Sequence, residues 1–112
     1  MNKIYTSIEQ SKKLAEILPL ESADMCWWQI YDTGHTSDYV IKMIPYIFKK
    51  DSIPCWSLST LLNLLPNYQL QTQDNDIGLL CSKDGKFNIV NANNPIDACY
   101  EMIIKLHEQN LI

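Results

Sequence analysis

The segment IGLLCSKDGKFNIVNA, residues 77–92, carries the clearest fold signal in the chain. Two runs of strand-forming residues flank Asp84-Gly85, and this dipeptide supplies the positive backbone angles that a tight hairpin turn requires. The residue pairs expected across this hairpin are Leu80 with Ile89 and Ser82 with Phe87 on one side, and Leu79 with Val90 on the other. The sequence therefore predicts an antiparallel hairpin over residues 77–92.

A helix is expected directly after this hairpin. Asn94 is a good cap residue, Pro95 suits the first helical position because its missing amide costs nothing there, and Asp97 adds a carboxylate near the positive end. The apolar stripe expected on one side of the helix comprises Ile96, Cys99, Tyr100, Ile103, Ile104, His107 and Leu111. The opposite side carries Asp97, Glu101, Lys105 and Glu108.

Upstream of the hairpin, the pattern predicts an edge strand preceded by a short, heavily buried helix. Tyr68, Leu70 and Thr72 alternate with glutamines, which indicates a strand whose glutamine side faces water. Ser57 is a good cap for a helix that ends before Pro66. The four leucines expected on one face of this helix are Leu58, Leu61, Leu62 and Leu65.

The first half of the chain predicts a helix followed by a second hairpin. Thr6 and Glu9 fit the two ends of a capping box, so we expect a helix over residues 7–18 that is stopped by Pro19. Residues 25–31 and 39–44 are rich in strand formers and flank the loop-like residues 32–38, which predicts a hairpin with Tyr31 opposite Tyr39.

These elements predict one small α+β domain over residues 1–112, with two antiparallel hairpins and a short edge strand packed with about three helices. A chain of 112 residues, 46% hydrophobic and 20% charged, has the size and composition of a single globular domain.

Composition excludes several classes of function. The chain has nine Lys, no Arg and a net charge of -4, which disfavours nucleic-acid binding because arginine is the usual reader of phosphates and guanine edges. No apolar run approaches the roughly 20 residues that span a bilayer. Residues 1–16 lack the features of a secretory signal, so we expect a cytoplasmic protein whose mature chain begins at or near Met1.

The cysteines are expected to be free thiols in the core. They lie far apart along the chain and each has apolar neighbours, as the positions Cys26, Cys55, Cys81 and Cys99 show. Their even number leaves two disulfides as the alternative.

No pattern points to a catalytic residue, a metal or a cofactor. Cysteine and histidine occur at no metal-ligand spacing, and Asp74-Asn75-Asp76 lacks the ligands that would complete a calcium loop, so a polar turn is the simpler interpretation. The glycines are isolated, which excludes a standard phosphate-binding loop. Only His35 and His107 could activate a nucleophile, and neither has a local catalytic signature around it.

The aromatic residues of the first hairpin and the segment after it are the candidate binding residues. Adjacent Trp27 and Trp28 point to opposite faces of a strand, so one bulky ring lies on the face turned away from the main core. Packing explains this if helices cover one face and residues 46–56 cover the other. The alternative is a surface for a protein partner, a second copy or a small ligand, formed by Trp27, Trp28, Tyr39 and Trp56.

The chain also resembles small uncharacterised proteins found in gut-bacterial genomes and their phage or mobile elements. The motifs that carry the resemblance are Ser7-x-Glu9-Gln10-Ser11-Lys12-x-Leu14, Leu18-Pro19, Ala23-Asp24-Met25 with Trp27-Trp28, Ile53-Pro54-Cys55-Trp56-Ser57-Leu58-Ser59-x-Leu61-Leu62-x-Leu64-Leu65-Pro66, and Asp97-Ala98-Cys99-Tyr100-Glu101. The resemblance spans most of the chain and implies a compact intracellular domain. It implies no activity and no site residue.

The sequence thus favours a non-enzymatic cytoplasmic module that binds a protein partner or a second copy of itself, in a phage or mobile-element setting. The alternative is a small enzyme or small-molecule-binding protein whose pocket is lined by the same aromatic residues and by one cysteine or histidine.

Overall fold

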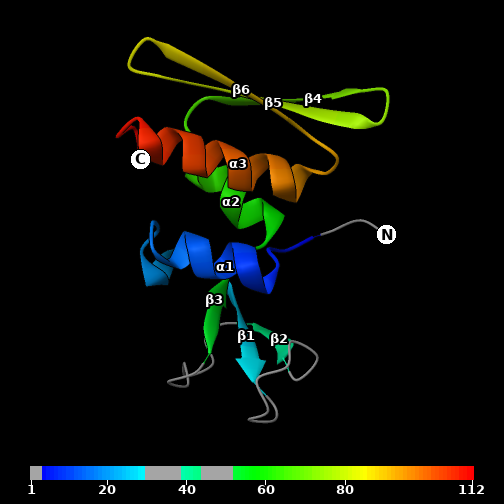
Figure 1. Ribbon diagram of the computed structural model, residues 1–112, viewed down its shortest axis with the longest axis vertical. Helices are drawn as coiled ribbons and strands as arrows, with labels where there is room; N and C mark the ends of the chain where they lie inside the picture. The colour runs from blue at the N-terminus through cyan, green and yellow to red at the C-terminus, as the bar shows by residue number, and fades with distance from the viewer. Residues whose placement is uncertain (1–3, 30–38, 44–51) are drawn as a thin grey trace. The chain divides into compact units, whose positions relative to one another are not determined.

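The computed structural model describes residues 4–29, 39–43 and 52–112 (Figure 1). These residues form two compact units. The N-terminal unit is Tyr5–Ser57, and the C-terminal unit is Leu58–Ile112 together with Ile4. The expectation of one domain over residues 1–112 stays a prediction, and each unit is described by itself.

The described residues of the N-terminal unit form one α-helix and a three-stranded antiparallel sheet with the strand order β2-β1-β3. Its elements are α1 (Ile8–Ala15), the 3-10 turn η1 (Leu20–Ser22), β1 (Met25–Gln29), β2 (Tyr39–Met43) and β3 (Ile53–Cys55). Strands β1 and β2 pair as the predicted first hairpin requires, but Gln29 rather than Tyr31 lies opposite Tyr39. The register is therefore shifted by two residues from the predicted one, and a shift of two keeps the alternation of the strand faces. Tyr31 and the predicted loop 32–38 lie outside the described residues.

Strand β3 corrects the expectation for the segment after the hairpin. We expected residues 46–56 to cover one face of the hairpin, but Ile53–Cys55 instead pairs along the free edge of β1. Pro54 lies in this strand, opposite Cys26, and an edge strand tolerates proline because its outer side needs no amide for a further strand. The sheet is therefore one strand wider than the sequence indicated, and residues 46–51 lie outside the described part of the chain.

The capping box of α1 is one residue later than predicted. The Ser7 hydroxyl accepts a hydrogen bond from the backbone N–H of Gln10, and the side-chain oxygen of Gln10 accepts one from the backbone N–H of Ser7, both at 3.1 Å. Thr6 cannot cap the helix because its hydroxyl is buried, 2.7 Å from the Ser11 hydroxyl and accepting from the Trp56 amide at 3.2 Å. The regular helix ends at Ala15 rather than residue 18.

The C-terminal unit contains two helices and a three-stranded antiparallel sheet with the order β4-β5-β6. Its elements are α2 (Leu58–Leu64), β4 (Tyr68–Gln73), β5 (Asp76–Lys83), β6 (Lys86–Ala92) and α3 (Pro95–Glu108). The second hairpin and all three predicted pairs across it are confirmed. Asp84 and Gly85 take positive φ angles of 52° and 79°, as the predicted turn requires. Strand β4 is an edge strand, also as predicted.

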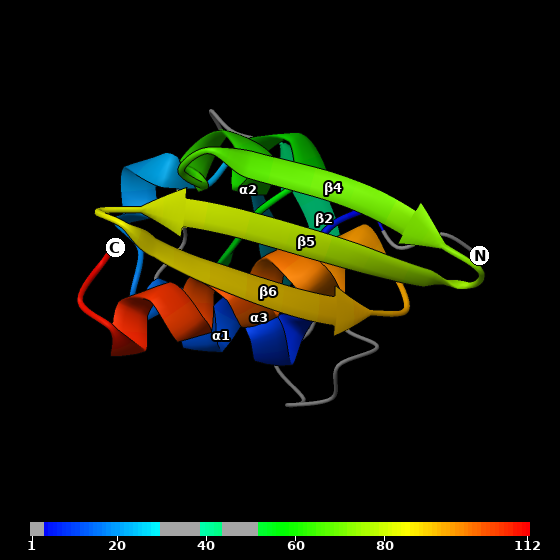
Figure 2. The same ribbon diagram turned by 90° about the horizontal axis from the view of Figure 1, so that it is seen from above.

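Both helices of this unit lie on the same side of its sheet (Figures 1 and 2). Helix α3 packs against β5, β6 and α2. Asn94 caps α3 by accepting from the Asp97 amide at 2.9 Å, and Pro95 begins the helix, as predicted. Leu61 in α2 and Leu65 directly after it are buried, whereas Leu58 and Leu62 are half-buried, so the helix is less buried than expected.

The buried side of α3 differs in part from the predicted stripe. The helix residues that are buried are Ile96, Ala98, Cys99, Met102, Ile103 and Leu106, and Leu111 is buried after the helix ends. His107 is exposed, and Tyr100 and Ile104 are half-buried. The buried side of the helix therefore includes Met102 and Leu106, which the predicted stripe did not, because α3 packs against α2 as well as against the sheet.

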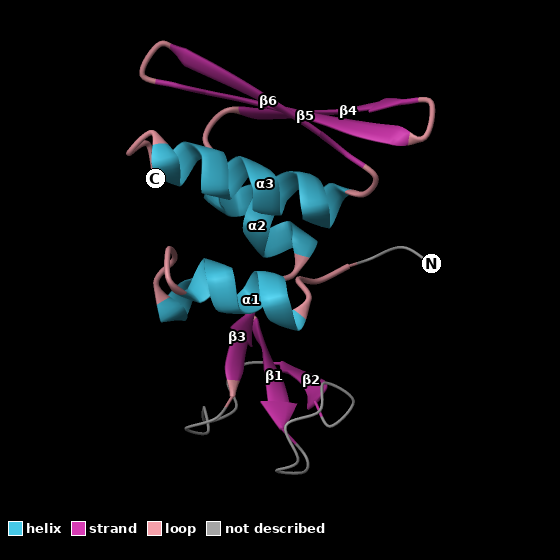
Figure 3. Ribbon diagram, in the orientation of Figure 1, coloured by secondary structure: helices cyan, strands magenta, loops and turns pink. Residues whose placement is uncertain are grey.

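The described chain is thus an α+β structure in which each unit combines helix with antiparallel sheet (Figure 3). The four cysteines are free and buried, which confirms the prediction of core thiols. None of the three described α-helices has the length and hydrophobicity needed to cross a lipid bilayer.

Candidate binding surfaces

The structure does not bring the four predicted binding residues together. Trp56 is fully buried and its indole N–H donates to the Ser22 hydroxyl at 3.0 Å, so we correct its assignment to a surface: its ring belongs to the core. Trp27 and Trp28 are half-buried and occupy opposite faces of β1, as predicted. Tyr39 lies in β2 opposite Gln29, and its side chain is outside the described part of the structure.

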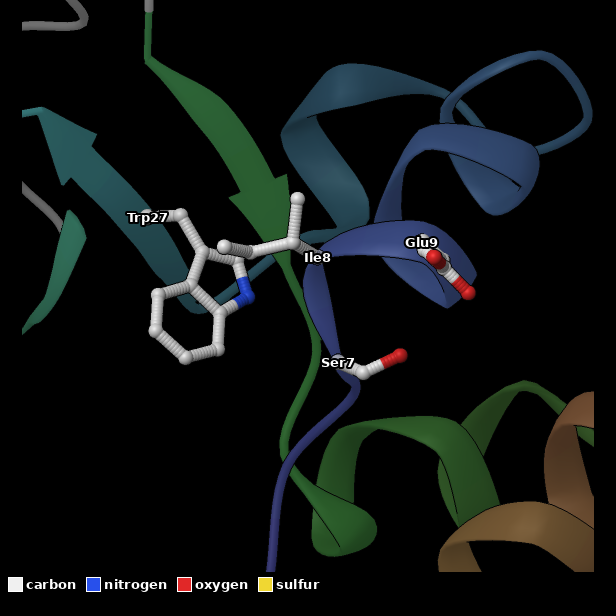
Figure 4. Close-up of a pocket in the computed structure, with 4 residues that line it drawn as sticks. All are labelled: Ser7, Ile8, Glu9 and Trp27. Carbon is white, nitrogen blue, oxygen red and sulfur yellow. The ribbon is translucent and has the colours of Figure 1, made fainter. Parts of the chain in front are cut away.

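Trp27 lines a pocket of about 380 Å³ with Ser7, Ile8 and Glu9. In Figure 4 the Ile8 side chain extends toward the Trp27 indole, whereas Ser7 and Glu9 point away from the indole. The polar edge of Trp27 is already occupied, because its N–H donates to the Thr6 carbonyl at 3.1 Å. The described lining residues include neither histidine nor cysteine, and Ile8 and Trp27 give the pocket an apolar wall.

The largest exposed apolar side chains of the described strands lie on the sheet of the C-terminal unit. Phe87 and Ile89 in β6 are 73% and 60% exposed. Register places them on the same face as Leu80. Leu80 pairs with Ile89, and Phe87 precedes Ile89 by two residues on the same strand. We call this the outer face and define it as Gln69, Gln71, Gly78, Leu80, Ser82, Phe87, Ile89 and Asn91.

The opposite face of the same sheet forms the core of the unit. Leu79, Cys81, Asn88 and Val90 alternate with the residues of the outer face and are buried on the side of α3. Asn88 and Gln109 join their side-chain amides through two hydrogen bonds of 3.1 and 2.7 Å. Since both helices of the unit pack on this inner side, no described element of the unit covers the outer face (Figures 1 and 2).

A hollow of about 230 Å³ lies in the outer face. Gly78 stands in the middle strand between its pairing partners Gln71 and Asn91, and the missing side chain leaves a gap between their amides. Leu80 and Ile89 form the apolar border of the hollow. The outer face therefore carries both a depression and, at Phe87, a protruding ring.

Three of the four thiols, Cys55, Cys81 and Cys99, are poor nucleophiles in the folded state. Burial raises the pKa of Cys81 to about 11 and that of Cys99 to about 12. Burial also raises the pKa of Cys55, which lies 3.4 Å from the Thr6 hydroxyl. A thiol must lose its proton to attack, so these three groups are unreactive near neutral pH.

The described residues provide no alternative chemical centre of the kinds considered from the sequence. Within residues 4–29, 39–43 and 52–112, no group of three or more His, Cys, Asp or Glu is placed to hold a metal ion. His107 is exposed on α3, and His35 lies outside the described residues. Asp74 and Asn75 form the turn between β4 and β5, in agreement with the polar-turn interpretation.

Sequence reasoning missed the outer face although the decisive pairs were predicted. Pairing Leu80 with Ile89 and Ser82 with Phe87 already placed three large apolar side chains on one face. The sequence pattern does not show which face of the hairpin the last helix covers. Comparison of this chain with protein-family models, with curated proteins and with solved structures found no match, so the candidate surfaces stand on their geometry alone.

Proposed function

We propose that the protein acts by binding another protein molecule through the outer face of the β4-β5-β6 sheet, and that it is a non-enzymatic interaction module. The observation that carries this proposal is the exposure of Phe87 and Ile89, 73% and 60%, beside Leu80 on one continuous face. Contiguous apolar patches cost solubility and typically mark interaction sites. Aromatic side chains are enriched in such interfaces.

The chemistry of the thiols supports the same proposal. The aromatic pocket that an enzyme was expected to use would also contain a cysteine or histidine. The pocket beside Trp27 has neither among its described lining residues, and the pKa values of Cys55, Cys81 and Cys99 are raised. The cytoplasmic location and the phage or mobile-element setting remain part of the proposal and rest on composition and resemblance.

A photo-crosslinking amino acid at position 87 tests the proposal in the cells that produce the protein. We expect irradiation to give a discrete adduct, because Phe87 is the most exposed apolar side chain of the proposed contact. The matched control places the same amino acid at Leu20, which is 49% exposed and lies in the N-terminal unit. No adduct from position 87, or the same adducts from both positions, would contradict the proposal.

The pocket beside Trp27 supports a second candidate function, the binding of a small molecule. Its volume of about 380 Å³ falls within the range of ligand pockets, roughly 300–1,000 Å³. A small apolar ligand resting on Trp27 and Ile8 should lose its binding in Trp27→Leu and keep it in Phe87→Ser. The opposite result would assign ligand binding to the outer face.

A further inference from the structure

We infer that the partner of the outer face is a second copy of this chain, with Phe87 of each copy seated in the Gly78 hollow of the other. This inference rests on the proposed function and names its partner. It follows from two properties of the outer face: a protrusion and a hollow of matching size, and their positions in the sheet.

The protrusion and the hollow match in size. The Phe87 ring is 73% exposed and therefore projects from the sheet, whereas the hollow at Gly78 measures about 230 Å³. A cavity of about 150 Å³ is large enough to hold benzene, so the hollow admits a phenyl ring. Its border is apolar at Leu80 and Ile89 and polar at Gln71 and Asn91.

The positions of the two features suit a two-fold axis. Gly78 pairs with Asn91, and Phe87 lies four residues before Asn91, so the protrusion and the hollow are separated by roughly 13 Å along the strands. Their midpoint lies at the pair Leu80 and Ile89. Phe87 is on β6 and Gly78 is on the neighbouring strand β5, so the two features are also offset by one strand, roughly 5 Å. A two-fold axis that is parallel to the sheet, passes between Leu80 and Ile89 and is inclined by roughly 20° to the direction across the strands brings each Phe87 over the Gly78 of the other copy. Such an interface is closed, and it also buries Leu80 and Ile89 against their counterparts.

The centre of the outer face has no charged residue. Register places Asp76 on this face, at the end near the β4–β5 turn. Lys83 and Lys86 pair on the opposite face, where the Lys83 ammonium donates to the Leu111 carbonyl at 2.6 Å. Contact between the centres of two outer faces therefore buries no charged side chain.

The amides on the face are compatible with contact between identical surfaces. Gln69, Gln71 and Asn91 each carry a hydrogen-bond donor and an acceptor in one side chain, so each can pair with an amide of the other copy. Two sheets packed face to face at about 10 Å are a common architecture. The outer face of one copy therefore supplies the shape and the hydrogen-bonding groups that the other needs.

Sedimentation velocity of the purified full chain across a range of concentrations tests the inference. We expect a dimer for the natural chain and at least a tenfold weaker association for Phe87→Ser, as is typical for removal of a central aromatic residue. Gly78→Leu should weaken association to a similar degree by filling the hollow. This variant should stay folded, because a Cβ at position 78 would lie 3.4 Å from the Asn91 side-chain oxygen and 3.9 Å from the Gln71 carbonyl oxygen.

A double variant tests whether positions 78 and 87 meet across the interface. In Gly78→Leu combined with Phe87→Ala, the leucine of each copy occupies the space that the other copy's ring has left. We expect this double variant to associate more tightly than the sum of the two single losses predicts. Leu20→Ser is the matched control, because it removes an exposed apolar side chain outside the sheet and should leave the dimer intact.

The possible outcomes separate this inference from the proposed function. A natural chain that stays monomeric, or a dimer that survives both Phe87→Ser and Gly78→Leu, overturns the second-copy inference. If the crosslinker at position 87 then captures a different protein, the outer face still binds a partner and only the identity of that partner is wrong. If it captures nothing, both proposals fail.

Discussion

At the scale of the residue, the buried cysteines make the protein less stable as the pH becomes alkaline. Burial raises the pKa of Cys81 to about 11 and of Cys99 to about 12, from about 9 for a free thiol. The folded state therefore holds these protons more tightly than the unfolded state, and the stability they contribute is complete below pH 9. We expect the free energy of unfolding, measured with urea, to fall as the pH rises from about 9 toward 11 to 12.

Tyrosine and lysine also titrate in this range, so a variant is needed as the control. Cys99→Ala removes one of the two shifted groups. It should lower stability at pH 7, because it leaves a small cavity in the core, but its stability should fall less steeply above pH 9. An unchanged slope in Cys99→Ala would mean that the thiol loses its proton as easily in the folded protein as in the unfolded chain.

At the scale of the element, the first turn of α1 depends on Ser7. The Ser7 hydroxyl and the Gln10 side chain exchange hydrogen bonds with the backbone, both at 3.1 Å. We expect Ser7→Ala to lower the free energy of unfolding by about 1 kcal/mol, as is usual for the loss of a helix cap. Chemical denaturation in moderate salt measures this loss.

Glu9→Gln is the matched control for the cap. Glu9 is exposed and takes no part in the box that the structure shows, and salt screens its attraction to the helix dipole. Its replacement should change stability by no more than about 0.5 kcal/mol. A loss in Glu9→Gln equal to that in Ser7→Ala would instead support the box between Thr6 and Glu9 that the sequence predicted.

At the scale of the whole molecule, the inferred dimer makes thermal stability depend on protein concentration. Association of folded chains favours the folded state by mass action, so the unfolding midpoint should rise as the concentration is raised. Differential scanning calorimetry over a hundredfold range of concentration measures this shift. In Gly78→Leu the midpoint should rise less with concentration than in the natural chain, and a midpoint that is constant in the natural chain would contradict the dimer.

Local signals predicted much of the fold because the backbone itself obeys them. Asp84 and Gly85 adopt the positive φ angles that their turn needs, and this fixes the register of the second hairpin. Asn94 and Pro95 begin α3 for an equally local reason, the unsatisfied amides of its first turn. The α+β class and the free cysteines also followed from patterns in neighbouring residues.

Features that depend on competition between distant residues were not predictable. Thr6 satisfies the sequence rule for a cap, but its hydroxyl is used by Ser11 and Trp56. Trp56 looked available for binding, but the Ser22 hydroxyl satisfies its N–H and lets the ring be buried. Strand β3 formed because β1 had a free edge, which a proline-containing segment could fill.

The sequence by itself determined where the chain turns and which side chains share a strand face, because turn geometry and the period of two are properties of adjacent residues. Only the tertiary structure decided which face is covered. Helix α3 buries Leu79 and Val90 and leaves Phe87 and Ile89 exposed, although both faces of the hairpin are apolar. One helical layer can cover one side of a sheet, and the side it covers is set by the packing of the whole unit.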